Sequence, residues 1–222
     1  MIHIKHIISN PFQENCSIVW DNSGKCAIID PGYTDAEREQ IVALIETKKL
    51  TPSAIMLTHG HLDHIFGLAD FVQTYNVPIY MDGKERYSFE HTNPHICSLY
   101  GLPLPKTPGG SFIDVEDGEI IEVGSLRFEV IKTPGHSVGG LCFLERNEKV
   151  LFSGDTLFAG AIGRTDHPGG DYDVLMKSIW EKLMPLDGDI TVYPGHGNAT
   201  DIATERMTNP FLMPFNEPYY EE

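Results

Sequence analysis

The sequence lacks any apolar run long enough to cross a membrane, and residues 1–10 show no basic segment followed by an apolar one. We therefore expect neither a membrane partner nor a secretory signal. The four cysteines are scattered with no Cys-x-x-Cys pair, so a disulfide framework is not indicated. Cys16, Cys26 and Cys142 lie in apolar, strand-like runs, where a small buried side chain is the expected role. These features predict a protein of the reducing cytoplasm.

Basic residues are also scarce. The chain has 16 Lys and Arg against 32 Asp and Glu, which gives a formal net charge of -16. Nucleic acids and anionic membranes are bound through dense Lys and Arg surfaces, so neither is a predicted partner. We expect a small-molecule substrate instead, and the sequence does not indicate an oligomeric state. At 222 residues and 41% hydrophobic content, the chain predicts a single globular domain over residues 1–222.

Strand and helix patterns alternate along the chain, which indicates an α/β fold. Turn residues at 21–24 join two short strands and predict a hairpin, which makes the first sheet mixed. The pattern occurs in residues 1–110 and again in 111–222, as in a pseudo-repeat of two packed sheets with helices outside. Strands are predicted at 2–8, 16–20, 25–29, 53–57, 77–81, 112–115, 119–123, 126–132, 140–145, 149–153 and 190–193, and helices at 35–49, 64–72, 171–183 and 200–208.

Residues 83–111 show little pattern beyond a short helix near 83–90 and a proline- and glycine-rich stretch near 101–110. We interpret this segment as a surface insertion beside the functional site, where it forms a wall for the substrate. His91 and His95 lie in it and are predicted to be ordinary loop residues.

A short stretch from Thr58 to His64 contains three histidines and one aspartate. Neutral imidazole and carboxylate oxygen are both good ligands for zinc or iron, and a polar loop rarely has this spacing by chance. His59 and His61 would point the same way in an extended segment, because alternate side chains share a face. Asp63 is expected to cap the following helix, and His64 to begin it. The two parts of the cluster then face different directions, which favours two metal ions over one.

Three further residues of these types follow predicted strands: His136, Asp155 and His196. Loops at strand ends carry functional groups because the sheet fixes their positions, so we expect these side chains to meet the histidine cluster at one rim. Asp30 also ends a strand, directly before Pro31. It is either a turn residue or a carboxylate that orients a metal-bound histidine, and the sequence leaves both roles open.

Arg164 is the only basic residue in its glycine-rich loop. It either binds a substrate carboxylate or pairs with Asp166 or Asp171, and we favour the structural pair. His167, which precedes a proline, is predicted to be a loop residue.

These motifs occur in the order found in a known family. Thr58-His59-x-His61-x-Asp63-His64, then His136, Asp155 and His196, resemble the metal motifs of the metallo-β-lactamase superfamily, and Ile29-Asp30-Pro31-Gly32 resembles its first motif. The resemblance covers essentially the whole chain. It implies an αββα sandwich of two mixed β-sheets with helices on the outer faces.

The resemblance also implies two divalent metal ions, with zinc favoured and iron or manganese as alternatives. The implied ligands are His59, His61 and His136 for the first metal, Asp63, His64 and His196 for the second, and Asp155 as the bridge between them.

Within the superfamily, the chain most resembles short-form glyoxalase II-like thioester hydrolases, through Ile162-Gly163-Arg164-Thr165-Asp166 and Glu205-Arg206-x-x-Asn209-Pro210. This resemblance implies hydrolysis of thioesters such as hydroxyacylglutathione, with a metal-bridging hydroxide as the nucleophile and Asp63 orienting it. Two departures bear on the substrate. The superfamily's β-lactamases often carry cysteine where Asp155 stands, which argues against antibiotic hydrolysis. We also expect no helical C-terminal domain like that of full-length glyoxalase II enzymes, because few residues follow His196.

Three other functions fit parts of the pattern. A persulfide dioxygenase of the same superfamily would use one iron held by His59, His136 and Asp155. A phosphodiester nuclease on this scaffold would need a basic surface, which the composition does not supply. A non-catalytic metal-binding protein is the third alternative, although structural zinc sites are usually closed sets of four Cys and His ligands.

Overall fold

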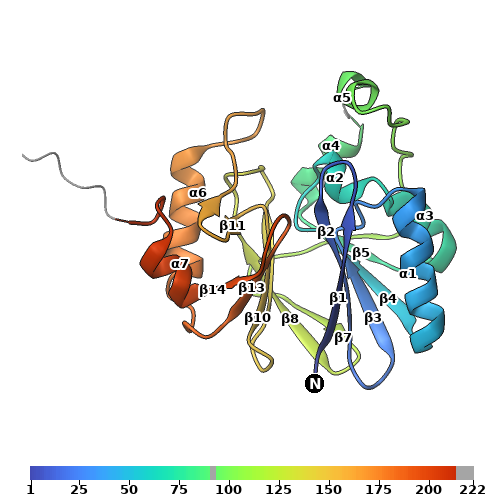
Figure 1. Ribbon diagram of the computed structural model, residues 1–222, viewed down its shortest axis with the longest axis horizontal. Coiled ribbons are helices and arrows are strands. Elements are labelled where there is room, and N and C mark those ends of the chain that lie inside the picture. Colours follow the sequence, from blue (N-terminus) through green and yellow to red (C-terminus); the bar gives the residue numbers. More distant parts are fainter. Residues whose placement is uncertain (91–93, 214–222) are drawn as a thin grey trace, which may run out of the picture.

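The computed structural model describes residues 1–90 and 94–213, and it contains two six-stranded mixed sheets (Figure 1). The first sheet has its strands in chain order. The first three strands are antiparallel neighbours and the last three run parallel to the third. Its strands are β1 (His3–Ser9), β2 (Glu14–Trp20), β3 (Lys25–Ile29), β4 (Thr51–Met56), β5 (Ile79–Met81) and β6 (Phe112–Asp114).

The second sheet has the order β14-β13-β10-β9-β8-β7, with one parallel pair, β10 and β13. The chain passes from the first sheet to the second between β6 and β7, a little beyond the predicted division near residue 110. Its strands are β7 (Ile120–Val123), β8 (Leu126–Lys132), β9 (Leu141–Glu145), β10 (Val150–Gly154), β13 (Thr191–Pro194) and β14 (Thr200–Asp201). A separate small hairpin joins β11 (Leu157–Phe158) and β12 (Ala161–Ile162).

Helices cover the two outer faces of the sheets (Figure 1). Helices α1 and α3 lie against the first sheet, and α6 and α7 lie against the second. The helical segments are α1 (Asp35–Lys48), α2 (Leu62–Ile65), α3 (Leu68–Tyr75), η1 (Gly83–Glu85), α4 (Arg86–Glu90), α5 (Pro94–Leu99), α6 (Tyr172–Ser178), η2 (Ile179–Leu183) and α7 (Ile202–Thr208).

Three layers of buried apolar side chains hold the sheets and helices together. Successive residues of β3 show how the layers form, because side chains alternate across a strand. Ile28 packs toward the helices of the first sheet, whereas Ala27 and Ile29 on either side of it pack toward the second sheet. A third cluster joins the second sheet to α6 and α7. This arrangement confirms the predicted αββα sandwich.

Most predicted elements lie where the patterns placed them, with a few differences. The helix expected over 171–183 is α-helical only to Ser178 and continues as the π-helix η2. The insertion contains three short helical segments, η1, α4 and α5, and His91 lies outside the described residues. All four cysteines are free and buried, as expected for three of them. No helix in residues 1–90 or 94–213 is long and apolar enough to span a membrane.

Candidate metal centre

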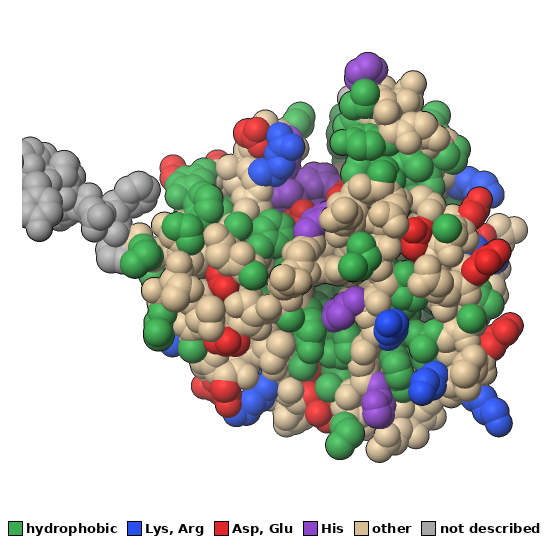
Figure 2. Space-filling model, in the orientation of Figure 1, with side chains coloured by type: hydrophobic (Ala, Val, Ile, Leu, Met, Phe, Trp, Pro, Cys, Tyr) green, Lys and Arg blue, Asp and Glu red, His purple; other side chains and the backbone are tan. Residues whose placement is uncertain are grey.

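The predicted ligands come together at one edge of the sandwich, between the two sheets. The loop after β4 supplies His59 and His61, and the loops after β8, β10 and β13 supply His136, Asp155 and His196. Figure 2 shows histidine side chains gathered in a hollow at the upper edge, between two projecting parts of the surface. The strand ends therefore deliver side chains from both halves of the chain to one place.

The first group consists of His59, His61 and His136, whose ring nitrogens converge on one point. His59 Nε2 lies 3.0 Å from His61 Nδ1 and 3.2 Å from His136 Nε2. His61 Nδ1 lies 2.9 Å from His136 Nε2. Three imidazole nitrogens at these separations match the ligands of a single zinc or iron ion, which binds each nitrogen at about 2.0–2.1 Å.

The second group consists of Asp63, His64 and His196. His196 Nε2 lies 3.2 Å from Asp63 Oδ2, and His64 Nε2 lies 3.9 Å from the same oxygen. Asp155 lies between the groups: its Oδ2 is 3.5 Å from His136 Nε2 and 3.6 Å from His196 Nε2, and its Oδ1 is 3.4 Å from His64 Nε2. The geometry thus places one carboxylate where it reaches nitrogens of both groups.

Hydrogen bonds fix the orientation of the rings. His136 Nδ1 donates to the carbonyl oxygen of Arg164 at 2.8 Å, so its proton is on Nδ1 and the Nε2 lone pair is free. His64 Nδ1 lies 3.0 Å from Asp30 Oδ2. The Asp30 carboxylate also accepts from the backbone nitrogen of Thr58 at 2.7 Å and from its hydroxyl at 2.6 Å. Of the two roles left open for Asp30, this geometry favours the carboxylate that orients a histidine.

The three histidines of the first group are held neutral. Burial, followed by repulsion from neighbouring imidazoles, lowers the pKa of His59 well below its usual value and lowers that of His61 to about 3. Burial also lowers the pKa of His136, although Asp155 opposes the shift. A metal ion binds the neutral imidazole, so these side chains are in the state that ligation needs.

The carboxylates of Asp63 and Asp155 give the second group a negative electrostatic potential. Burial lowers the pKa of His64 and His196, but the neighbouring carboxylates Asp63 and Asp155 outweigh it and raise both values. Conversely, burial raises the pKa of Asp63 and Asp155, and the neighbouring histidines outweigh that effect and lower both. A site that attracts protons so strongly also attracts cations, and a metal ion would replace those protons.

Unpartnered buried atoms test whether a metal ion fits. His64 Nε2 and Asp155 Oδ1 are buried and have no hydrogen-bond partner within the described chain. Buried polar atoms are rarely left without a partner, and these two face each other inside the ligand cluster. The donor set of imidazole nitrogen and carboxylate oxygen suits divalent metal ions, so the residues fit the expected metals.

The predicted cap of α2 is wrong, whereas Arg164 forms one of its two predicted structural pairs. Asp63 does not cap α2, because His61 keeps the extended backbone of the N-cap position and Asp63 lies in the first turn. Its carboxylate turns toward His196 instead. Arg164 pairs with Asp166, through two bonds of 2.7 and 3.0 Å, and not with Asp171. Both side chains of that pair are largely exposed, so the pair contributes little stability.

Two other residues contact the ligands or their loops, and neither was predictable from the sequence. The ring of His167 lies 4.7 Å from that of His61 and 4.9 Å from that of His136, with each ring pair nearly perpendicular. The buried Glu85 bonds to the backbone of two ligand loops. Both contacts depend on how loops distant in the sequence meet, and no local motif reports that.

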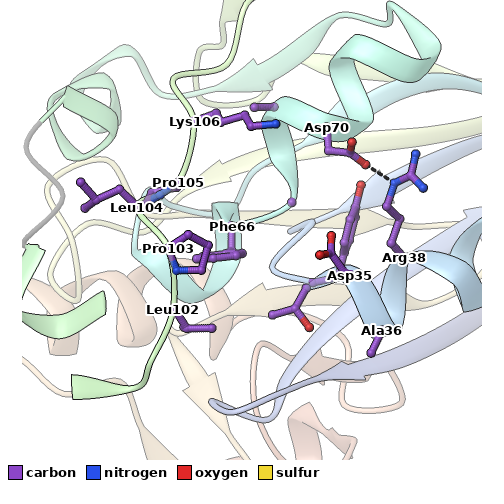
Figure 3. Close-up of a pocket in the computed structure, with 14 residues that line it drawn as sticks. Asp35, Ala36, Arg38, Phe66, Asp70, Leu102, Pro103, Leu104, Pro105 and Lys106 are labelled. Carbon is purple, nitrogen blue, oxygen red and sulfur yellow. Dashed lines mark hydrogen bonds and ion pairs between the residues drawn. The ribbon is translucent and has the colours of Figure 1, made fainter. Parts of the chain in front are cut away.

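A hollow of about 460 Å³ lies beside the end of α2, between the start of α1 and residues 102–106. Figure 3 shows Phe66 and Pro103 at one side of it, with the Arg38–Asp70 ion pair at the other. None of the side chains lining this hollow is a candidate ligand. The predicted chemistry therefore belongs to the histidine-lined hollow at the edge of the sheets.

Several known proteins are similar to this chain over nearly its whole length. Hydroxyacylglutathione hydrolase GloC of Haemophilus influenzae is 41% identical over 95% of this chain and 98% of its own length. Two solved structures are also similar along their full lengths. The BLEG-1 B3 metallo-β-lactamase is 37% identical over 96% of this chain, with a TM-score of 0.85. TTHA1623 in a di-iron-bound form is 35% identical over 94% of this chain, with a TM-score of 0.82.

The chain also matches a protein-family model over most of its length. The model of the metallo-β-lactamase superfamily matches residues 9–196, a range that includes every candidate ligand. The chain belongs to the metallo-β-lactamase superfamily.

Proposed function

We propose that this protein is a metal-dependent hydrolase of thioesters, of the hydroxyacylglutathione hydrolase type. The observation that carries the proposal is the position of Asp155, which lies within 3.6 Å of histidine nitrogens from both ligand groups. A carboxylate in that position is suited to ligating two metal ions. The similarity to GloC along nearly the whole of both chains supports the thioester substrate.

Two divalent ions held by these residues would lower the pKa of a bound water molecule and polarise a substrate carbonyl. The chain's own residues prepare that chemistry. Asp63 lies 3.2 Å from His196 Nε2, at the open side of the second group, where its carboxylate would orient the attacking water. The leaving thiolate has a pKa of about 8.5 in solution, so its departure needs little help from a general acid.

We further propose zinc as the native metal, with iron or manganese as alternatives, and a cytoplasmic location. Four free, buried cysteines suit a reducing compartment. The relative crystallised in a di-iron-bound form supports iron as the stronger alternative. The substrate is expected to be a small molecule.

The direct test is hydrolysis of S-lactoylglutathione by the purified protein, with metal content measured on the same sample. We expect turnover that is lost on chelation and recovered with zinc. Asp155→Ala should lose metal and activity together, because its carboxylate serves both groups. An Asp155→Ala protein with full metal content and normal turnover would falsify the proposal.

β-Lactam hydrolysis is a second candidate, because the BLEG-1 relative is described as a B3 metallo-β-lactamase. A chromogenic cephalosporin assayed beside the thioester measures it. Oxygen consumption with a persulfide substrate measures the alternative of a mononuclear iron dioxygenase. Cephalosporin turnover without thioester turnover, or oxygen consumption by a protein that holds one iron, would replace the thioesterase proposal.

A further inference from the structure

Glu85 is a buried carboxylate in the insertion, and both of its oxygens are hydrogen-bonded to backbone amides. The residue is 1% exposed. Oε2 accepts from the backbone nitrogen of Gly60 at 2.8 Å, and Oε1 accepts from that of Gly139 at 2.6 Å. No ion pair in the described ranges includes Glu85, so its carboxyl group is held by these amides and not by a cationic side chain.

The two amides belong to the two loops that supply the first ligand group. Gly60 lies between His59 and His61, in the loop that follows β4 of the first sheet. Gly139 lies in the loop that carries His136, just before β9 of the second sheet. One carboxylate therefore connects the loop of two histidines to the loop of the third.

Both amides belong to glycines, and the packing requires glycine at each. A Cβ at Gly60 would lie 2.9 Å from the carbonyl oxygen of Glu85 and 3.0 Å from its Oε2. A Cβ at Gly139 would lie 3.0 Å from Glu85 Cγ. Side chains at these positions would push the carboxylate away from the amides, so the close approach depends on all three residues.

Glu85 itself is held firmly at the end of β5. Its own backbone nitrogen donates to the carbonyl oxygen of Asp82 at 3.0 Å, and the Asp82 side chain accepts from the nitrogen of Lys84 at 2.9 Å. The nitrogen of Gly83 donates to Asp114 Oδ1 at 2.6 Å, which ties η1 to β6. The carboxylate thus projects from a fixed support into the gap between the loops.

We propose that Glu85 is a positioning residue for the first metal position. Its two charge-assisted hydrogen bonds set the distance between the His59–His61 loop and the His136 loop before a metal arrives. When the site is already assembled, metal binding does not include the free-energy cost of ordering the two loops. The inference rests on the proposed metal binding, and it does not depend on which substrate is hydrolysed.

The test measures cobalt affinity of the metal-stripped protein by competition with a chelator, and it records the ligand-field spectrum. In Glu85→Gln, an amide group replaces one oxygen, so one of the two backbone donors loses its acceptor. We expect affinity at the first position to fall by about 10- to 100-fold, the usual effect of losing a group that supports metal ligands. The cobalt spectrum should change as well, because the ligand nitrogens move.

Glu145→Gln is the matched control. Glu145 is 2% exposed and also accepts from two backbone nitrogens, those of Arg127 and Glu148, but it lies on β9 away from the ligands. We expect this variant to lose stability without any change in cobalt affinity or spectrum. Equal effects of the two substitutions on cobalt binding would show that Glu85 acts only through general stability.

A double-mutant comparison separates the two metal positions. In a His196→Ala background, which impairs the second position, Glu85→Gln should keep its full effect on cobalt affinity. In a His136→Ala background, which impairs the first, the effect should disappear.

If Glu85→Gln does not fold, Glu85→Asp serves in its place, since a side chain shorter by one methylene does not reach both amides. A folded Glu85 variant with wild-type cobalt affinity and spectrum overturns the inference. Because cobalt binding is the readout, that outcome differs from a failure to hydrolyse thioesters.

Discussion

Opposite shifts in histidine pKa separate the two ligand groups at the scale of single residues. His59, His61 and His136 are kept neutral chiefly by burial. His64 and His196 are buried as well, but the carboxylates beside them favour the protonated form. In the metal-free protein, protons therefore compete with a metal more strongly at the second group than at the first.

This difference predicts how the metal-free protein responds to pH. A histidine whose pKa is raised in the folded state stabilises the fold below its unfolded value of about 6.5, and the stabilisation is lost as the pH rises through the raised value. The histidines with lowered pKa are neutral in both states above about pH 7 and contribute no change there. We therefore expect the stability of chelator-treated protein to fall as the pH rises above about 7.

Urea unfolding of the metal-free protein at several pH values in this range measures the effect. His196→Ala should flatten the dependence, because it removes one of the two ligand histidines whose pKa is raised. If the free energy of unfolding of the metal-free protein rose with pH over the same range, it would contradict the raised pKa values of His64 and His196.

The sequence predicted the candidate ligands because each lies in a short motif or directly after a strand. His59, His61, Asp63 and His64 are neighbours in the chain, so their spacing alone reported a cluster. The supporting groups have no such signal. The partner of His136 is a backbone carbonyl, that of Arg164, and every residue has one. Glu85 is one of many carboxylates, and its role depends on where its loop folds.

At the scale of elements, the short helix α2 is held by backbone contact with the loop after β3. The nitrogen of Gly67, just beyond α2, donates to the carbonyl oxygen of Pro31 at 2.7 Å. Gly32 lies so close to α2 that a Cβ there would be 1.5 Å from the carbonyl oxygen of Asp63. The position of Asp63 and His64 thus depends on a site where only glycine fits.

Gly32→Ala should therefore displace α2. We expect a loss of about 1–3 kcal/mol in the free energy of unfolding, as for other overpacked sites, together with weaker metal binding at the second position. Gly109→Ala is the control, because nothing lies within 4 Å of a Cβ there, and its effect should stay within about 0.5 kcal/mol. Denaturant unfolding and metal titration of both variants test this. Normal metal affinity in Gly32→Ala would show that α2 adjusts without cost.

The elements themselves were predictable where the pattern is strong. Helix α1 has a capping box formed by Thr34 and Glu37, and buried Ile41 and Ile45 follow at helical spacing. The cap of α2 was misplaced because that helix is a single turn, too short to show a period. The two-residue strands β11 and β12 were missed for the same reason.

At the scale of the whole molecule, the two sheets are joined at both ends of the same strands. Asp30 and His136 follow the ends of β3 and β8, and the turns at the starts of these strands also meet. There, Asp21 accepts from the backbone nitrogen of Ser125 at 2.6 Å. Asp21 is 3% exposed and also accepts from the nitrogen of Ser23 at 2.8 Å. One buried carboxylate thus links the turn before β3 to the turn before β8.

Asp21→Ala should weaken this connection. We expect a loss of about 2–4 kcal/mol in the free energy of unfolding, because several donors lose a buried charged acceptor, while metal affinity stays unchanged. Asp171→Ala provides the comparison. Asp171 caps α6 through one bond of 3.1 Å to the nitrogen of Val174, and its loss should cost about 1 kcal/mol. Equal losses in the two variants would contradict a special role for Asp21.

The two connections have different consequences because only one of them can be removed by a chelator. In a protein stripped of metal, the link through Asp21 remains, whereas metal ions no longer hold the ligand loops together. Amide hydrogen exchange should then quicken in residues 58–66, 133–139 and 194–197, but not in residues 21–25 and 123–127. Chelation would therefore leave a molecule that is still folded, with its ligand end held by bonds such as those of Glu85 but more mobile than the end held by Asp21. The ligand end carries the histidines, so the apo protein would be most exposed to proteases and to unintended metals where its chemistry is proposed to occur.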